Sequence, residues 1–161
     1  MFSIKEIFDM AIMLENNGEA IYRSAAENLS DPSLVSLMLW MAEEEVRHAD
    51  WFSNRQREAV LVPSNPVADE MGRELFNDLL NGQNFSLDDV DFSRIDNVIS
   101  MVKTFIEFEK DTVIFYQMLE AFLQDERTQR ELKKIINEEE RHIESLKAFI
   151  SGGKILEAGG Q

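Results

Sequence analysis

The sequence predicts an all-α protein, a bundle of four long helices arranged as two helical hairpins. Apolar residues recur at the spacing of amphipathic helices, and no segment shows the alternating pattern of a strand. Capping and breaking residues divide this helical pattern into four segments. A repeat with a spacing of 94 residues makes the second half resemble the first. These three observations favour one domain that covers all 161 residues.

The first hairpin covers about residues 3–60. Its first helix is expected to run from Ser3 to about Leu29. The turn SDPS follows, in which Asp31 can cap a new helix and Pro32 suits its first turn. The second helix then continues until two prolines stop it.

The second hairpin covers about residues 93–151, and a crossover of residues 61–92 joins the two. Its helices are expected to meet at a turn near Asp125, and the last one to end before Gly152. The crossover carries one short amphipathic piece at 68–80. It is long enough to travel the length of a bundle, so the predicted topology is hairpin, long crossover, hairpin.

The repeat relates ionisable and other polar residues as well as residues of the core. Both histidines and both tyrosines of the chain fall into its register. The identical pairs are Glu15 and Glu109, Tyr22 and Tyr116, Leu29 and Leu123, Asp31 and Asp125, Glu45 and Glu139, Arg47 and Arg141, and His48 and His142.

Composition excludes several classes of function. A formal charge of -15 without a basic patch argues against a nucleic-acid partner. The chain has no cysteine, so a bound metal would be held by oxygen and imidazole nitrogen. No apolar run is long enough to span a membrane, and the first residues do not resemble an export signal, so we expect a cytoplasmic protein without a membrane partner.

Six polar residues interrupt the apolar faces of the four helices. They are Glu15, Glu45, His48, Glu109, Glu139 and His142. In an antiparallel hairpin, two residues are level when the turn lies midway between them. The midpoints of these sets fall at residues 30–31 and 124–125, where the two turns are predicted. We therefore expect all six side chains at one level of the core.

Four carboxylates buried together need compensating positive charge. Two divalent cations would balance them, and each Glu-x-x-His pair would give one metal an imidazole and a carboxylate from a single helical face. This ligand set matches that of the di-iron and di-manganese carboxylate proteins built on four-helix bundles. We expect two iron ions per chain, with manganese or zinc as substitutes.

The segments around these residues resemble the rubrerythrin branch of the ferritin-like diiron-carboxylate superfamily. ENNGEAIY and EKDTVIFY resemble the first and third helices of that family, and EEEVRHADWF and EEERHIESL its second and fourth. The resemblance covers both hairpins but not the crossover. It implies a ferritin-like fold in which the same six residues are the metal ligands.

The sequence departs from rubrerythrins at two points. Rubrerythrins also carry a rubredoxin-like domain with four cysteines, which is missing here, so the electrons are expected to come from an external electron-donor protein. They have an extra glutamate one turn beyond the third-helix ligand, associated with iron movement, and Thr112 stands at that place. This difference weakens the expectation of a rubrerythrin-type peroxidase activity.

Other polar residues near the six have two interpretations. Tyr22 and Tyr116 are either core aromatics or hydrogen-bond donors to a ligand carboxylate of the opposite hairpin. Glu19 lies one turn from Glu15, but its repeat mate is Val113, so its contribution stays open. The acids off the buried faces are expected to be solvated, and the two repeated arginines to pair with neighbouring acids. These acids are Glu43, Glu44, Glu138 and Glu140, and the arginines are Arg47 and Arg141.

The resemblance supports two functional hypotheses of different class. The first is a diiron oxidoreductase that reduces dioxygen or hydrogen peroxide. The second is a ferroxidase or iron-storage protein, for which assembly into a shell would be needed. A structural metal site in an interaction protein is a third reading. A homodimer or a larger homo-oligomer is expected in each case.

Overall fold

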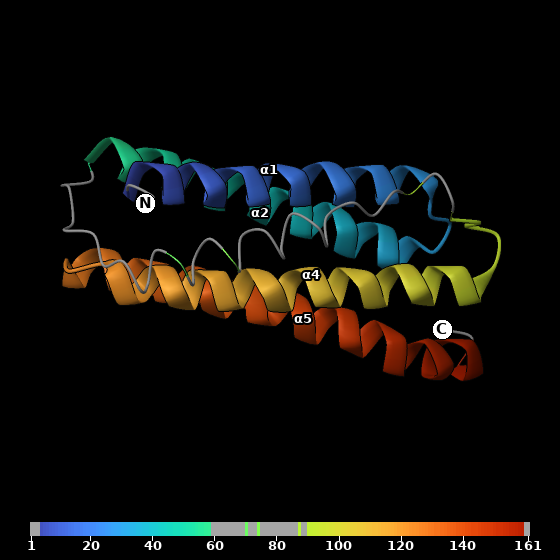
Figure 1. The fold of residues 1–161 in the computed structure, drawn as a ribbon. Helices are drawn as coiled ribbons and strands as arrows, with labels where there is room; N and C mark the ends of the chain where they lie inside the picture. Colours follow the sequence, from blue (N-terminus) through green and yellow to red (C-terminus); the bar gives the residue numbers. More distant parts are fainter. Residues whose placement is uncertain (1–3, 59–69, 71–73, 75–86, 88–89, 160–161) are drawn as a thin grey trace.

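A computed structural model of the protein describes residues 4–58, 70, 74, 87 and 90–159. Its helices are α1 (Ile4–Asn28), α2 (Pro32–Glu58), α4 (Ile95–Phe122) and α5 (Glu126–Gly159). α1 pairs with α2 and α4 with α5, and the two antiparallel hairpins lie against each other along one axis (Figure 1). The described residues contain no strand, and the predicted all-α bundle of two helical hairpins is confirmed.

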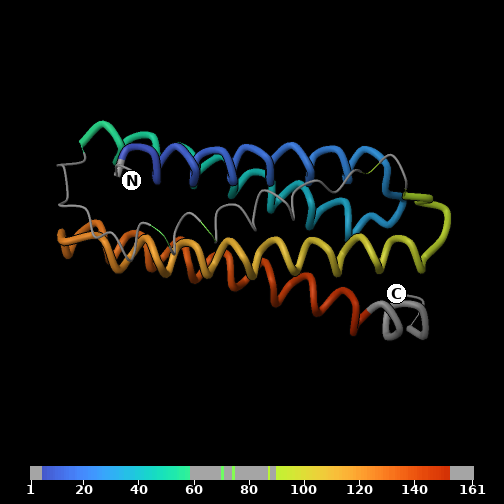
Figure 2. Tube along the Cα trace, viewed as in Figure 1, coloured from blue at the N-terminus to red at the C-terminus, as the bar shows by residue number. Residues whose placement is uncertain are grey.

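The two hairpin turns are built in the same way. Asp31 Oδ1 accepts a hydrogen bond of 2.9 Å from the backbone N–H of Leu34 at the start of α2. Asp125 Oδ2 accepts one of 3.0 Å from the N–H of Thr128 at the start of α5. Each aspartate therefore caps the helix that follows it. The two turns lie at opposite ends of the bundle (Figure 2).

Most helix ends lie within two residues of the predicted ones, but the end of α5 does not. The predicted stop before Gly152 is wrong, because α5 continues to Gly159. Gly152 keeps a backbone that other residues also adopt and does not take the left-handed conformation of a helix cap. Glycine weakens a helix by only about 1 kcal/mol relative to alanine, so it does not have to end one. The short amphipathic piece expected at 68–80 lies largely outside the described residues.

Aromatic pairs join the two hairpins on both sides of the bundle centre. The rings of Tyr22 on α1 and Phe105 on α4 meet edge to face at 5.2 Å. The rings of Phe52 on α2 and Tyr116 on α4 lie 4.9 Å apart. All four side chains are buried, so the middle of the bundle is closed by rigid apolar contacts. No helix within the described part of the chain is long and apolar enough to cross a membrane.

Candidate metal centre

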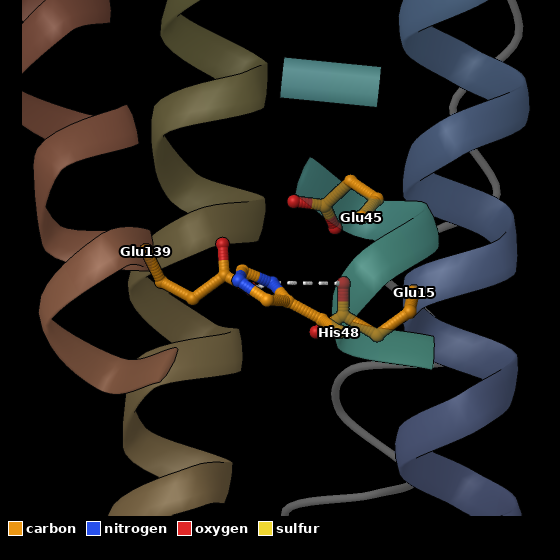
Figure 3. Close-up of side chains that lie close together, drawn as sticks. All are labelled: Glu15, Glu45, His48 and Glu139. Atoms are coloured by element: carbon orange, nitrogen blue, oxygen red, sulfur yellow. Dashed lines mark hydrogen bonds and ion pairs between the residues drawn. The ribbon is translucent and has the colours of Figure 1, made fainter. Parts of the chain in front are cut away.

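The six residues predicted from the sequence lie together in the core at mid-height of the bundle. At most 4% of any of these side chains is exposed. α1 contributes Glu15, α4 contributes Glu109, and α2 and α5 each contribute a glutamate and a histidine one turn apart. Figure 3 shows four of them, with carboxylates from three helices directed toward the ring of His48.

The six side chains form two groups that share two members. One group consists of Glu15, Glu45, His48 and Glu139, and the other of Glu45, Glu109, Glu139 and His142. Within each group, one nitrogen or oxygen atom per residue lies within 4.8 Å of the others. Each group thus offers four N and O donors, a set that suits a divalent ion. The glutamates Glu45 and Glu139 belong to both groups and therefore join them.

Both histidines turn the same ring nitrogen toward the carboxylates. His48 Nδ1 lies 2.9 Å from Glu139 Oε1, and His142 Nδ1 lies 2.9 Å from Glu139 Oε2. The other nitrogen, Nε2, points away from the cluster in both cases. It lies 2.6 Å from Glu138 Oε2 in His48 and 2.6 Å from Glu44 Oε2 in His142. An Nε2–H that donates to these carboxylates leaves Nδ1 free for a metal ion.

The expectation that Glu44 and Glu138 are solvated is therefore wrong. Glu44 is only 7% exposed, and Glu138 is half-buried. Both side chains reach across the interface to the histidine of the other hairpin, because a glutamate beside the buried stripe is long enough to bridge to the neighbouring helix. The sequence repeat could have indicated this shared role, since Glu44 and Glu138 are themselves 94 residues apart. Arg47 Nη2 pairs with Glu44 Oε1 at 2.7 Å, as expected for an arginine beside acids.

The two tyrosines connect the hairpins through the cluster. The hydroxyl of Tyr22 donates a hydrogen bond to Glu109 Oε1, and that of Tyr116 donates to Glu15 Oε1. Of the two interpretations offered by the sequence, the contact with a carboxylate of the opposite hairpin is confirmed. Each tyrosine thus restricts the rotation of one carboxylate of the cluster.

Two residues near the cluster do not contribute a polar atom to it. Glu19 is half-buried and forms an ion pair of 3.7 Å with Arg23, one turn further along α1. Thr112 is buried, and its hydroxyl donates a hydrogen bond of 2.9 Å to the carbonyl oxygen of Phe108. Neither residue belongs to a metal-binding group.

The crowding of carboxylates shifts their proton affinities in opposite directions. Burial raises the pKa of Glu45 well above its usual range, and the charge of Glu139 raises it further. The same two causes raise the pKa of Glu109 to about 7. Burial also acts on Glu15, but the charge and hydrogen bond of His48 outweigh it and lower its pKa. Burial lowers the pKa of both histidines, yet the surrounding carboxylates prevail and raise it. Protons thus replace part of the positive charge that metal ions would supply.

Buried polar atoms without a hydrogen-bond partner indicate whether this cluster suits a metal ion. Among the described residues, four buried side-chain atoms have no hydrogen-bond partner: Glu15 Oε2, Glu45 Oε1, Glu139 Oε2 and His142 Nδ1. All four belong to the six residues, although buried polar atoms are otherwise almost always paired. Two of them, His142 Nδ1 and Glu139 Oε2, lie 2.9 Å apart without a hydrogen bond. Lone pairs that converge in this way fit divalent cations better than protons.

A four-helix bundle with one Glu on each of two helices and Glu-x-x-His on the other two defines the ferritin-like diiron-carboxylate class. A Thermotoga maritima protein assigned to this class has the same fold, with a TM-score of 0.66 and 22% identity over 92% of this chain and 94% of that chain. The family model of rubrerythrin matches residues 6–150. This chain therefore belongs to the rubrerythrin family. A comparison with curated proteins found no match.

Proposed function

We propose that the protein is a non-heme diiron oxidoreductase that reduces dioxygen or hydrogen peroxide with electrons from an external donor. The observation that carries this proposal is the pair of buried donor groups that share Glu45 and Glu139. Shared carboxylates would hold two ions close enough to act on one small molecule. Two such ions suit a two-electron reaction. A structural site, in contrast, needs only one ion whose coordination positions are all filled by protein ligands.

A pair of ferrous ions would supply two electrons, which with two protons reduce one molecule of hydrogen peroxide to two of water. The protein residues would position and protect this pair. Its ligands would be Glu15, Glu45, Glu109, Glu139 and the two histidines, and the tyrosine hydroxyls restrict two of these carboxylates. The surrounding apolar side chains exclude bulk water, so reactive oxygen species are kept from the solvent.

Iron oxidation for storage is the second candidate function. The same ligand set would serve a ferroxidase, but storage requires many subunits that enclose iron. A sizing column distinguishes the two, because a dimer is too small to form a shell.

Metal content and an optical spectrum test the proposal. The protein is loaded anaerobically with ferrous iron, freed of excess metal and then mixed with air or hydrogen peroxide. We expect about two iron ions per chain, ferric charge-transfer absorption after either oxidant, and return of the ferrous state with a reductant. One ion or none, or iron that neither oxidant changes, would falsify the proposal.

A further inference from the structure

A groove between α2 and α5 lies beside the candidate metal centre, on the side of His48. It has about 280 Å³ of space for the centres of water molecules, which is enough for a small organic molecule. Two of its residues, His48 and Ile135, are buried, whereas Arg47 and Lys134 are exposed, so the groove opens to solvent. Its lining comes from four residues of α2 and four of α5: Arg47, His48, Trp51, Arg55, Glu131, Lys134, Ile135 and Glu138.

The two carboxylates of the groove already have partners in its own wall. Glu131 Oε2 accepts a hydrogen bond of 2.9 Å from Trp51 Nε1–H, and the same oxygen forms an ion pair with Arg55. Glu138 Oε2 lies 2.6 Å from His48 Nε2. Both carboxylates are therefore compensated by groups of the groove itself.

The cations of the groove are not all used in this way. Lys134 is exposed and forms no ion pair with another described residue. Arg47 pairs with Glu44 through one nitrogen, Nη2, of a guanidinium group that has five N–H donors. With Arg55, the lining has three cations and two compensated carboxylates, in a chain whose formal charge is -15. The groove is therefore locally positive, and its charge favours a monovalent anion.

The repeat shows that this groove is not a general result of the bundle geometry. The repeat mate of Lys134 is Trp40, whose ring meets the ring of His142 edge to face at 5.2 Å. Two further positions of the groove correspond to Leu37 and Phe149, apolar residues that pack against the core. One histidine of the centre is thus covered by a tryptophan ring of the bundle, whereas the other lines an open groove with charged walls.

We propose that this groove binds a small aromatic carboxylate. Lys134 and Arg47 would bind the carboxylate group, and Trp51 and Ile135 offer apolar surface to the ring. The inference goes beyond the proposed function, because His48 alone belongs both to the groove and to the six residues of the metal centre. A bound anion would lie beside the centre without occupying it.

The two tryptophans of the chain report on the two sides of the bundle separately. Trp51 lines the groove, and its indole N–H donates to Glu131, whereas Trp40 lies against His142. The full chain, loaded with zinc and labelled with nitrogen-15, should give one indole N–H signal for each in a two-dimensional NMR spectrum. Trp51→Phe assigns them. Benzoate is the probe, benzamide is its uncharged analogue, and acetate lacks the ring.

Three variants test the role of Lys134. Lys134→Met removes the charge and keeps the length of the side chain. Lys103→Met is the matched control, because Lys103 is exposed on α4 and does not line the groove. Lys134→Trp introduces the side chain of the repeat mate, which should close the groove. Since Lys134 is exposed, none of these changes removes a core contact.

We expect benzoate to shift the Trp51 signal with a dissociation constant of about 1 mM or lower, as suits a ligand of this size, and to leave the Trp40 signal in place. Benzamide and acetate should bind more weakly by about fivefold or more, and Lys134→Met should weaken benzoate binding to the same extent. Lys134→Trp should abolish it, and Lys103→Met should match the wild type.

Three results would overturn the proposal. They are a Trp51 signal that shows no saturable shift with benzoate, benzamide that binds as tightly as benzoate, and equal affinities for benzoate in Lys134→Met and Lys103→Met. The proposed function fails separately, because the zinc-loaded protein undergoes no oxidation. A protein that binds benzoate in this manner but whose iron neither oxidant changes keeps the groove site and loses the oxidoreductase activity.

Discussion

Glu44 Oε2 lies 2.6 Å from His142 Nε2, and these two residues belong to different hairpins. The repeat gives His48 the same kind of partner in Glu138, also at 2.6 Å. Each hairpin therefore orients the histidine of the other. Burial raises the pKa of Glu44, but the hydrogen bond from His142 prevails and lowers it. The centre is thus held together by contacts between hairpins as well as by its position on them.

Loss of either carboxylate should weaken metal binding. In Glu44→Ala the ring of His142 loses the partner that fixes its orientation, and we expect a 10- to 100-fold lower metal affinity, as is typical of such partners. Glu138→Ala should behave alike toward His48. A competition titration with a coloured chelator measures both. Glu43→Ala and Glu140→Ala are the matched controls because these glutamates are exposed. Equal affinities in Glu44→Ala and Glu43→Ala would show that the contact has no role.

Removal of the Tyr22 hydroxyl should destabilise the fold. In Tyr22→Phe the buried Glu109 Oε1 loses its donor, at a cost of about 1 to 3 kcal/mol in the free energy of unfolding. Urea denaturation of the metal-free protein measures this. The effect of Tyr22→Phe should largely disappear in a Glu109→Ala background, where the acceptor is already absent. If Tyr22→Phe lowers the free energy of unfolding by the same amount in both backgrounds, the effect comes from packing and not from the hydrogen bond.

Bound metal should stabilise the protein through the two shared glutamates. A ligand that binds only the folded state raises its stability by mass action, so removal of metal should lower the melting temperature at neutral pH. Because Glu45 belongs to both donor groups and Glu15 to one, Glu45→Ala should abolish most of this difference and Glu15→Ala a smaller part. Glu139→Ala should resemble Glu45→Ala. Calorimetry with and without metal measures the melting temperature of each variant. A larger loss of the metal-dependent difference in Glu15→Ala than in Glu45→Ala would contradict the idea that both donor groups share Glu45.

The metal-free protein should become less stable as the pH rises from 4.5 to above 7. The folded pKa of Glu109 is about 7 and its ordinary value is 4.5, so in this interval the folded state binds the proton and the unfolded state does not. This contribution is present at low pH and is lost as the pH passes 7, to an extent on the order of 3 kcal/mol. The raised pKa values of Glu45 and the histidines act in the same direction.

Urea denaturation at pH 6 and pH 8 checks this dependence. Glu109→Gln should make the dependence shallower, because glutamine does not titrate, while the contributions of Glu45 and the two histidines remain. Saturation with metal should also reduce it, since metal ions replace the protons. A metal-free protein that is more stable at pH 8 than at pH 6 would contradict the prediction.

The sequence by itself determined which residues face the core, because a helix repeats every 3.6 residues and burial follows that period. Glu15, Glu109 and the two Glu-x-x-His pairs interrupt apolar stripes, and the spacing to the turns at Asp31 and Asp125 places them at one height. The rule that glycine marks the end of a helix failed at Gly152, because α5 continues beyond this residue.

Only the tertiary structure decided which atoms meet across the helix interfaces. The periodicity places Glu44 and Glu138 beside the buried face, but it does not say that a long side chain bends across to another helix. Nor does it say which carboxylates both metal groups share. These contacts depend on the distance and rotation between packed helices, which arise from the whole core. The space left at Gly18 has the same origin, because it exists only where Glu45 of the neighbouring helix packs against a residue without a side chain.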